Sequence, residues 1–270
     1  MKYVDTVLRQ KNKETIDTFT EGIFCHTRFI GEKIIPMHVH INKSQLMYVD
    51  GKCIRIFYRI GDEVKTLFLP SRHFAWMPDG VLHSIESTNE DFTMRNIYFI
   101  DIGTDDFYKH VGVYAVNDLL LEMLKYIESW NSLILPTDEK RYTFLKALLL
   151  ILPDTGHKKL PFALPMAKDE RLKEILTYIE LQLMNELRIE SICTKFGFSP
   201  RNLLRLFQSD LKMPYAQYVK TLRAIRAIEL LTTTSLTLTE IAFRVGYDSF
   251  PTFSNTFFEI VGVRPKAYKK

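Results

Sequence analysis

The chain has 270 residues, of which 46% are hydrophobic and 25% are charged, values close to the averages of soluble globular proteins. This composition excludes a disordered, collagen-like or low-complexity chain, and the length favours two domains. The longest apolar runs fall well short of the roughly 18 residues that cross a bilayer, and charges occupy the N-terminal positions where an export signal would be apolar. Three widely spaced cysteines fit a reducing compartment. We therefore expect a cytoplasmic protein that does not span a membrane.

The positive charge is concentrated in the last third of the chain. The formal net charge is +4, and residues 188–270 contain 13 Lys and Arg against 6 Asp and Glu, whereas residues 1–163 contain 20 against 21. A basic domain of this size favours a polyanionic partner, because binding releases the counterions that surround the polyanion.

The first half of the chain has the pattern of short strands. Between residues 34 and 100, apolar and polar residues alternate in short runs that turn signals such as Asp50-Gly51 and Gly61-Asp62 separate. Successive short strands of this kind predict a sandwich or a small barrel. From residue 116 to residue 152 the apolar spacing becomes three and four, which predicts two helices. The proline-rich segment 153–165 predicts a linker.

An internal repeat occupies the C-terminal part of the chain. Residues 192–199 align with residues 241–248 at an offset of 49, which becomes 50 after one inserted residue. Each copy has a short amphipathic helix, a glycine, an aromatic residue, a capping residue and a second helix, which is the pattern of a helix-turn-helix unit. A long helix over residues 215–231 is predicted between the two units.

Helix-capping signals support both units. Gly197 and Gly246 allow the positive φ of a tight turn. Ser199 and Asp248 are the expected N-caps of the second helices. Ahead of the second unit, residues 237–240 have the Thr-x-x-Glu spacing of a capping box.

The last 100 residues or so resemble a known family. The residues that carry the resemblance are Leu238-Thr239-Glu240-Ile241-Ala242-Phe243-Arg244-Val245-Gly246-Tyr247, Phe253, Phe257, Gly262-Val263-x-Pro265 and Tyr268. They follow the signature of the AraC/XylS transcription regulators. The resemblance implies two helix-turn-helix units whose second helices enter the major groove on one face of double-stranded DNA.

The resemblance also implies which residues contact DNA. Base contacts are expected at Arg201, Asn202, Leu204, Arg205, Phe250, Pro251, Ser254 and Asn255. Arginine pairs with guanine and asparagine with adenine, so the first unit is expected to be more specific than the less polar second unit. Phosphate contacts are expected at Lys195, Lys212, Lys220, Arg223, Arg226, Arg244 and Lys266. For each of these residues, plain solvent exposure is the alternative. Lys212 stands where the family usually has glycine, and a left-handed cap there costs on the order of 1 kcal/mol.

Histidines in the first half have a second characteristic spacing. His38-x-His40, Gln45 and Pro78-x-Gly80-x-x-His83 resemble the two cupin motifs, in which histidines and an acidic residue surround a metal inside a small barrel. Here an uncharged amide replaces the acid, which makes a weaker ligand. We therefore expect no metal and no cofactor, and we keep His38, His40, Gln45 and His83 as the alternative metal site.

The same half contains Gln45-Leu46-Met47-Tyr48, Trp76-Met77-Pro78 and Met94-Arg95-Asn96-Ile97-Tyr98. With these runs it resembles the effector-binding domain of AraC-type regulators, which implies a small-molecule sensor. An effector site in the barrel is expected to involve His38, His40, Tyr48, Trp76, His83 and Arg95. A core position is the alternative for Tyr48 and Trp76. The resemblance further implies a homodimer formed through the helical pair, for which a buried intramolecular role is the alternative.

The predicted fold class is α+β with two domains. Residues 1–112 are expected to form a cupin-like effector-binding β-barrel, 113–153 a helical pair for dimerisation, 154–167 a linker and 168–270 an all-α DNA-binding domain. The predicted function is transcription regulation, with DNA, a small-molecule effector and RNA polymerase as partners, and no enzymatic activity. The alternative is a metal-dependent cupin enzyme with an accessory DNA-binding tail. The sequence has no phosphate loop and no nucleophile elbow, so it gives no support to other common enzyme classes.

Overall fold

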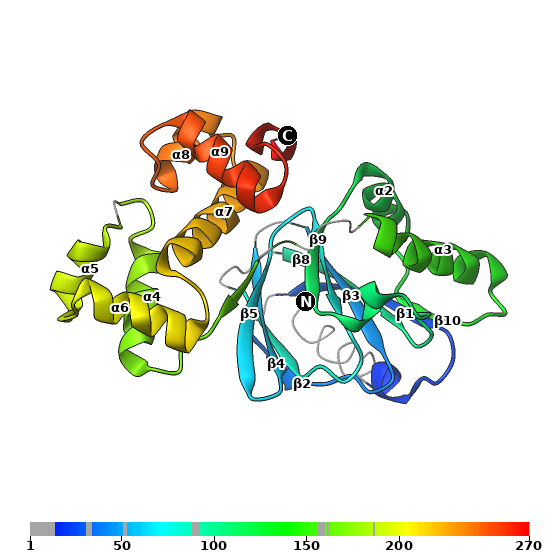
Figure 1. The fold of residues 1–270 in the computed structure, drawn as a ribbon. Coiled ribbons are helices and arrows are strands. Elements are labelled where there is room, and N and C mark those ends of the chain that lie inside the picture. Colours follow the sequence, from blue (N-terminus) through cyan, green and yellow to red (C-terminus); the bar gives the residue numbers. More distant parts are fainter. Residues whose placement is uncertain are drawn as a thin grey trace.

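A computed structural model describes residues 14–30, 34–50, 53–87, 92–155, 160, 162–185 and 187–269. A β-rich N-terminal region is followed by a helical C-terminal region (Figure 1), in agreement with the predicted two-domain organisation. In these parts of the chain, none of the helices combines the length and the apolar character that a membrane crossing requires.

The N-terminal region consists of two antiparallel sheets. Its strands are β1 (Ile23–Ile30), β2 (Ile34–His38), β3 (Ser44–Asp50), β4 (Ile54–Ile60), β5 (Glu63–Leu69), β6 (His73–Met77), β7 (His83–Glu86), β8 (Phe92–Phe99), β9 (Gly112–Ala115), β10 (Ser132–Ile134) and β11 (Ala163–Pro165). One sheet has the order β10-β1-β8-β3-β6-β9 and the other the order β11-β5-β4-β7-β2. The predicted alternation holds on β4, where Ile54, Ile56 and Tyr58 are buried between partly exposed neighbours.

The six-stranded sheet is buried on both faces. One face packs against the five-stranded sheet, so that Met47 of β3 and Ile56 of β4 belong to the same hydrophobic cluster. The other face is covered by α2 (Asp118–Tyr126) and α3 (Glu139–Thr155), whose buried leucines belong to one cluster with Leu46 and Trp76. The two helices predicted between residues 116 and 152 are therefore present, and they cover this sheet (Figure 1).

Part of the predicted linker is a strand. The β11 strand pairs with β5, and the Phe68 N–H donates to the Phe162 carbonyl (2.9 Å). Phe162 and Leu164 alternate into the core, a period-2 pattern that the flanking prolines obscured in the sequence. A proline is compatible with this position because β11 lies at the edge of its sheet.

The C-terminal region is helical. Its elements are α4 (Glu170–Leu181), α5 (Ile189–Phe196), α6 (Pro200–Leu206), the π-helical turn η2 (Phe207–Leu211), α7 (Tyr215–Thr233), α8 (Leu238–Arg244), α9 (Phe250–Val261) and the 3₁₀ turn η3 (Pro265–Tyr268); a further 3₁₀ turn, η1 (Asp106–Lys109), precedes β9. The long helix α7 lies between the α5–α6 pair and the α8–α9 pair (Figure 1). Eleven of its 19 residues are buried, as expected of a helix packed on most sides.

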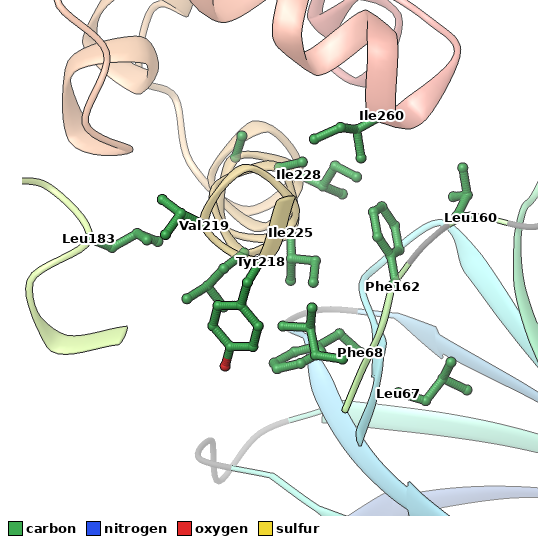
Figure 2. Packing of buried hydrophobic residues seen from close by; sticks show 14 of the residues in the cluster. Leu67, Phe68, Leu160, Phe162, Leu183, Tyr218, Val219, Ile225, Ile228 and Ile260 are labelled. Carbon is green, nitrogen blue, oxygen red and sulfur yellow. The ribbon is translucent and has the colours of Figure 1, made fainter. Parts of the chain in front are cut away.

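The two regions share a hydrophobic core. Figure 2 views α7 along its axis and shows Tyr218 and Ile225 on the side where Phe68 and Phe162 of the β region lie, and all four residues belong to one buried cluster. Polar contacts accompany this packing: the Arg55 guanidinium on β4 forms an ion pair with Glu180 on α4 (2.9 Å). The segment before α4 therefore connects the two regions as part of their common core.

Candidate nucleic-acid interface and the histidine cluster

The first helix-turn-helix unit has the predicted turn and cap. Gly197 has φ of +71° at the end of α5, in the left-handed region that favours glycine. The Ser199 hydroxyl accepts from the backbone N–H of Asn202 (3.3 Å), and Pro200 occupies the first helical turn of α6. These local signals fix the direction in which α6 leaves the turn.

The second unit has the predicted capping box, but its second helix begins one residue later than expected. The capping box of Thr237 and Glu240 is present at α8, and Gly246 has φ of +85°. The N-cap of α9 is Ser249, whose hydroxyl accepts from the Thr252 N–H (3.4 Å); the prediction of Asp248 was wrong. The inserted residue of the repeat explains the shift, since an offset of 50 aligns Ser249 with the cap of the first unit.

In the first unit the expected base-contacting residues lie together on the surface. Arg201, Asn202, Leu204 and Arg205 are all exposed on α6. The opposite side of the helix is buried through Leu203 and, in η2, through Phe207. This periodicity gives α6 a mainly polar, basic outer face.

In the second unit the structure exposes two of the four expected residues. Pro251 and Asn255 are exposed, but Phe250 packs partly into the core against Phe253. Ser254 is buried, and its hydroxyl and carbonyl accept from the Arg264 guanidinium (3.3 and 3.2 Å).

Thr252 is exposed on the same outer turn of α9 and was not among the predicted residues. The repeat contains the signal for it, because an offset of 50 aligns Thr252 with Asn202. The contacts of these residues with DNA bases stay a prediction.

Three of the expected phosphate-contacting residues bind polar groups next to them on the surface. Lys220 pairs with Glu259 across α7 and α9 (3.6 Å), and the Lys212 ammonium donates to the Ser209 carbonyl (2.8 Å). Arg226 pairs with Glu229 one turn away on α7. Lys212 has φ of +54°, which confirms the left-handed cap. Lys195, Arg244 and Lys266 are exposed.

Arg223 has a structural position. Its guanidinium donates to the Asn185 carbonyl (3.2 Å) and lies 5.1 Å from the centre of the Tyr247 ring. A Cβ at Gly246 would lie 2.5 Å from the same guanidinium. Arg223 therefore links the segment after α4 to the turn of the second unit, and this contact could not be inferred from its charge alone.

The structure brings together three of the six expected effector-binding residues. His38 ends β2, His40 follows it, and His83 begins β7. Their ring centres lie 4.3 Å apart for His38 and His83, 4.9 Å for His38 and His40, and 5.4 Å for His40 and His83. We call these residues the histidine cluster.

Two backbone segments are held together around the histidine cluster. The Gly80 N–H donates to the His40 carbonyl (3.0 Å), and the Asn42 N–H donates to the Asp79 carboxylate (2.6 Å). The Asp79 N–H in turn donates to the Ser44 hydroxyl (3.1 Å). These bonds fix the loop after β2 against the turn before β7, so that histidines far apart in the sequence meet.

Burial keeps two rings of the cluster, those of His40 and His83, neutral at neutral pH. It lowers the pKa of His40 to about 3, and the neighbouring His38 and His83 rings lower it further. Burial, together with His38, lowers the pKa of His83 to about 4. Neutral imidazoles have a nitrogen lone pair available for a ligand.

Polar residues of β3 and β8 lie beside the cluster. The ring centre of Tyr98 is 4.9 Å from that of His40, and the Tyr98 hydroxyl accepts from the Gln45 amide (3.1 Å). The same amide donates to Asn96 (2.8 Å). Tyr98 and Asn96 were not predicted as site residues, although both follow from the alternation along β8.

Tyr48, Trp76 and Arg95 lie on the opposite face of the six-stranded sheet. The Trp76 indole N–H donates to the Tyr108 carbonyl (2.9 Å). Arg95 donates to the Leu124 carbonyl at the end of α2 (3.1 Å) and pairs with Glu128. Successive strand residues point to opposite faces, and Tyr48 is an odd number of residues from Gln45, which lies beside the histidine cluster. Tyr48, Trp76 and Arg95 therefore do not share one lumen with the histidines.

The C-terminal geometry, with two helical pairs around one long helix, defines a helix-turn-helix protein. Residues 192–270 match the model of the "Helix-turn-helix domain" family. The chain is 32% identical over 98 residues to the HTH-type transcriptional activator AarP of Providencia stuartii, a match that covers 36% of this chain and 73% of AarP. The chain belongs to the AraC-type family of helix-turn-helix regulators.

Two other similarities each cover a little over a third of the chain. A match of 32% identity over 104 residues to the putative HTH-type transcriptional regulator YkgA of Escherichia coli (strain K12) covers 38% of this chain and spans 44% of the length of YkgA. A solved transcriptional regulator with an AraC-type DNA-binding domain, from Chromobacterium violaceum, is 30% identical over 37% of this chain and 88% of that one, with a TM-score of 0.35.

Proposed function

We propose that the protein is a sequence-specific, DNA-binding transcription regulator of the AraC type. The observation that carries the proposal is the exposed face of α6, where Arg201, Asn202 and Arg205 lie side by side in a basic domain. These are the side chains that pair with guanine and adenine edges. Membership of a family of transcription regulators supports the same function. It also favours regulation over the alternative of a metal-dependent enzyme.

The length of α7 fits two contacts on one side of a duplex. A helix of 19 residues is about 28 Å long, close to the roughly 34 Å between successive major grooves. In this proposal α6 and α9 enter adjacent grooves while lysines and arginines contact phosphates. Because α9 exposes fewer polar groups than α6, its half of the operator is the less specific one.

In vitro selection tests this function directly. The purified full chain is incubated with a library of random DNA duplexes, and the bound fraction is amplified and sequenced over several rounds. We expect two enriched sequence elements whose centres lie about 10 base pairs apart. Recovery of sequences with no enriched element, at an affinity equal to that for random DNA, contradicts the proposal.

The N-terminal region is proposed to be a cupin-like sensor of a small-molecule effector. The support is a group of buried polar side chains around the histidine cluster, in a region that shares its core with α7. An effector changes DNA binding only when its affinity differs between two conformations of the protein. The proposed function includes a homodimer formed through α2 and α3, which expose Leu119 and Leu150. It also includes contact with RNA polymerase.

A further inference from the structure

We propose that His38, His40 and His83 bind a divalent first-row transition-metal ion through three imidazole nitrogens. This site lies in the β region, and its existence does not depend on the DNA-binding function proposed above. It differs from the expectation of no metal, which rested on the missing acidic residue rather than on the arrangement of the histidines.

The distances in the histidine cluster suit a shared ion. One ligand nitrogen from each of the three side chains lies within 4.8 Å of the other two. A tetrahedral ion with bonds of about 2.0–2.1 Å places its nitrogen ligands about 3.3 Å apart. Small side-chain rotations close this difference, since hydrogen bonds already fix the loop after β2 against the turn before β7.

Backbone carbonyls select the tautomer that a metal needs. Nδ1 of His38 lies 2.8 Å from the Pro36 carbonyl, and Nδ1 of His83 lies 2.9 Å from the Val81 carbonyl. A carbonyl only accepts, so in each neutral ring Nδ1 carries the proton and Nε2 carries the lone pair. Such second contacts orient the histidine ligands of metal sites.

The buried nitrogens of the cluster lack protein partners. Both ring nitrogens of His40, and Nε2 of His83, are buried without a hydrogen-bond partner among the described residues. A polar atom buried in this way is unfavourable unless something satisfies it. A metal ion satisfies a lone pair that faces inward.

The donor set indicates the class of ion. Imidazole nitrogens suit zinc, copper, nickel, cobalt and iron better than calcium or magnesium, which prefer oxygen. Among the described residues, the side chains that lie close enough together to share one metal ion are the three histidines, with no carboxylate among them. Three neutral ligands leave the ion with its full charge and with an open position, which an oxygen donor from solvent or from a small anion fills.

Metal binding is tested with the untagged full chain, stripped of metal by a chelator. Titration with Co²⁺, followed by its visible d–d absorption, is expected to show one ion per chain, which Zn²⁺ displaces. His40→Ala and His83→Ala are each expected to lower the affinity for Co²⁺ at least about 100-fold, because each removes a direct ligand. His110→Ala is the matched control, since this histidine is exposed at the C-terminal cap of η1 and its ring pairs with Asp106.

A second measurement separates ligand loss from misfolding. Saturating Zn²⁺ is expected to raise the melting temperature of the wild-type chain, because a ligand that binds the folded state stabilises it. His38→Gln, at a partly exposed position, is expected to fold and to lose this shift. The proposal is overturned when the wild-type chain shows neither Co²⁺ absorption nor a Zn²⁺ shift, or when the His→Ala variants retain full affinity. Failure of DNA binding leaves these outcomes unchanged.

Discussion

The two helix-turn-helix units have the same interior and different surfaces. Phe207 of the first unit and Phe257 of the second occupy matching positions of the repeat, and both are fully buried. Outside, Arg201 and Arg205 of α6 correspond to Pro251 and Asn255 of α9. Packing fixes the interior positions of both units, whereas the exposed positions can differ without altering the fold.

Their turns also differ in their surroundings. A Cβ on Gly197 would meet no atom within 4 Å, whereas one on Gly246 would lie 2.5 Å from the Leu183 carbonyl. The turn of the second unit is thus packed against the segment after α4, and Arg223 stabilises that contact. The turn of the first unit has no such close neighbour at its glycine.

Loss of either matching phenylalanine gives the largest expected effect. Phe207→Ala and Phe257→Ala are each expected to lower the free energy of unfolding by about 3–5 kcal/mol, because a cavity replaces a buried ring. Denaturant unfolding of the full chain measures the loss. A cost confined to one of the two variants contradicts the shared interior.

The contact between Tyr268, which follows the second unit, and His73 of β6 is expected to be sensitive to acid. The Tyr268 hydroxyl donates to Nε2 of His73 (3.1 Å) while Nδ1 donates to the Ser71 carbonyl (2.9 Å), and the two rings stack 5.5 Å apart. Burial lowers the pKa of His73 to about 4, so the unfolded chain binds this proton more readily than the folded one. Stability is therefore fully present above the ordinary histidine pKa and is lost as the pH falls towards 4.

The expected loss from His73 is about 3 kcal/mol between pH 7 and pH 4. Unfolding at several pH values measures it, and His73→Phe, which keeps a ring against Tyr268, is expected to show a smaller acid dependence. If the wild-type chain and the His73→Phe variant show the same pH dependence of unfolding, His73 is not the cause of the loss of stability in acid.

The two turn glycines are expected to differ in how much stability is lost when each is replaced by alanine. Gly246→Ala is expected to cost about 2–3 kcal/mol, because the methyl group meets a backbone carbonyl at a residue with positive φ. Gly197→Ala is expected to cost about 1 kcal/mol, since only the left-handed backbone is unfavourable there. Thermal unfolding of the two variants compares them, and equal losses contradict the difference in crowding.

Base contact is expected to be unequal between α6 and α9. Arg205→Ala is expected to weaken binding to the selected operator by about 1–3 kcal/mol and binding to random DNA much less. Asn255→Ala is expected to have a smaller effect, because the Arg264 guanidinium already occupies its carbonyl oxygen (2.8 Å). Fluorescence anisotropy on both duplexes gives the two differences. Equal losses on operator and random DNA for Arg205→Ala exclude it as a base contact.

A phosphate contact gives the smallest expected change. Lys220→Ala is expected to weaken binding to all duplexes similarly and to lower the slope of log affinity against log salt by about one. Its pairing with Glu259 reduces the effect, so Glu259→Gln is expected to strengthen binding slightly. A loss for Lys220→Ala that is confined to the operator contradicts a phosphate role.

Local signals in the sequence were sufficient for much of the fold. The strand alternation around β4, the two helices that cover the sheet, both glycine turns, the capping box and the left-handed Lys212 were all predicted and are present. Each depends on residues within about four positions of one another, where backbone geometry and periodicity decide the outcome. The N-cap at Ser249 was missed by a single residue for the same reason, since two adjacent residues both suit a cap.

Sequence patterns were sufficient to recognise the family, the helical units and the residue types available to each site. Which of those residues meet depends on the folded arrangement. Pairing of β2 with β7 brought three histidines together, the pleat of β3 and β8 sent Tyr48 and Arg95 to the other face, and the long helix engaged Arg223 in a structural contact. The physical reason is that such meetings depend on strand register and on packing between segments distant in the chain, which no local pattern encodes.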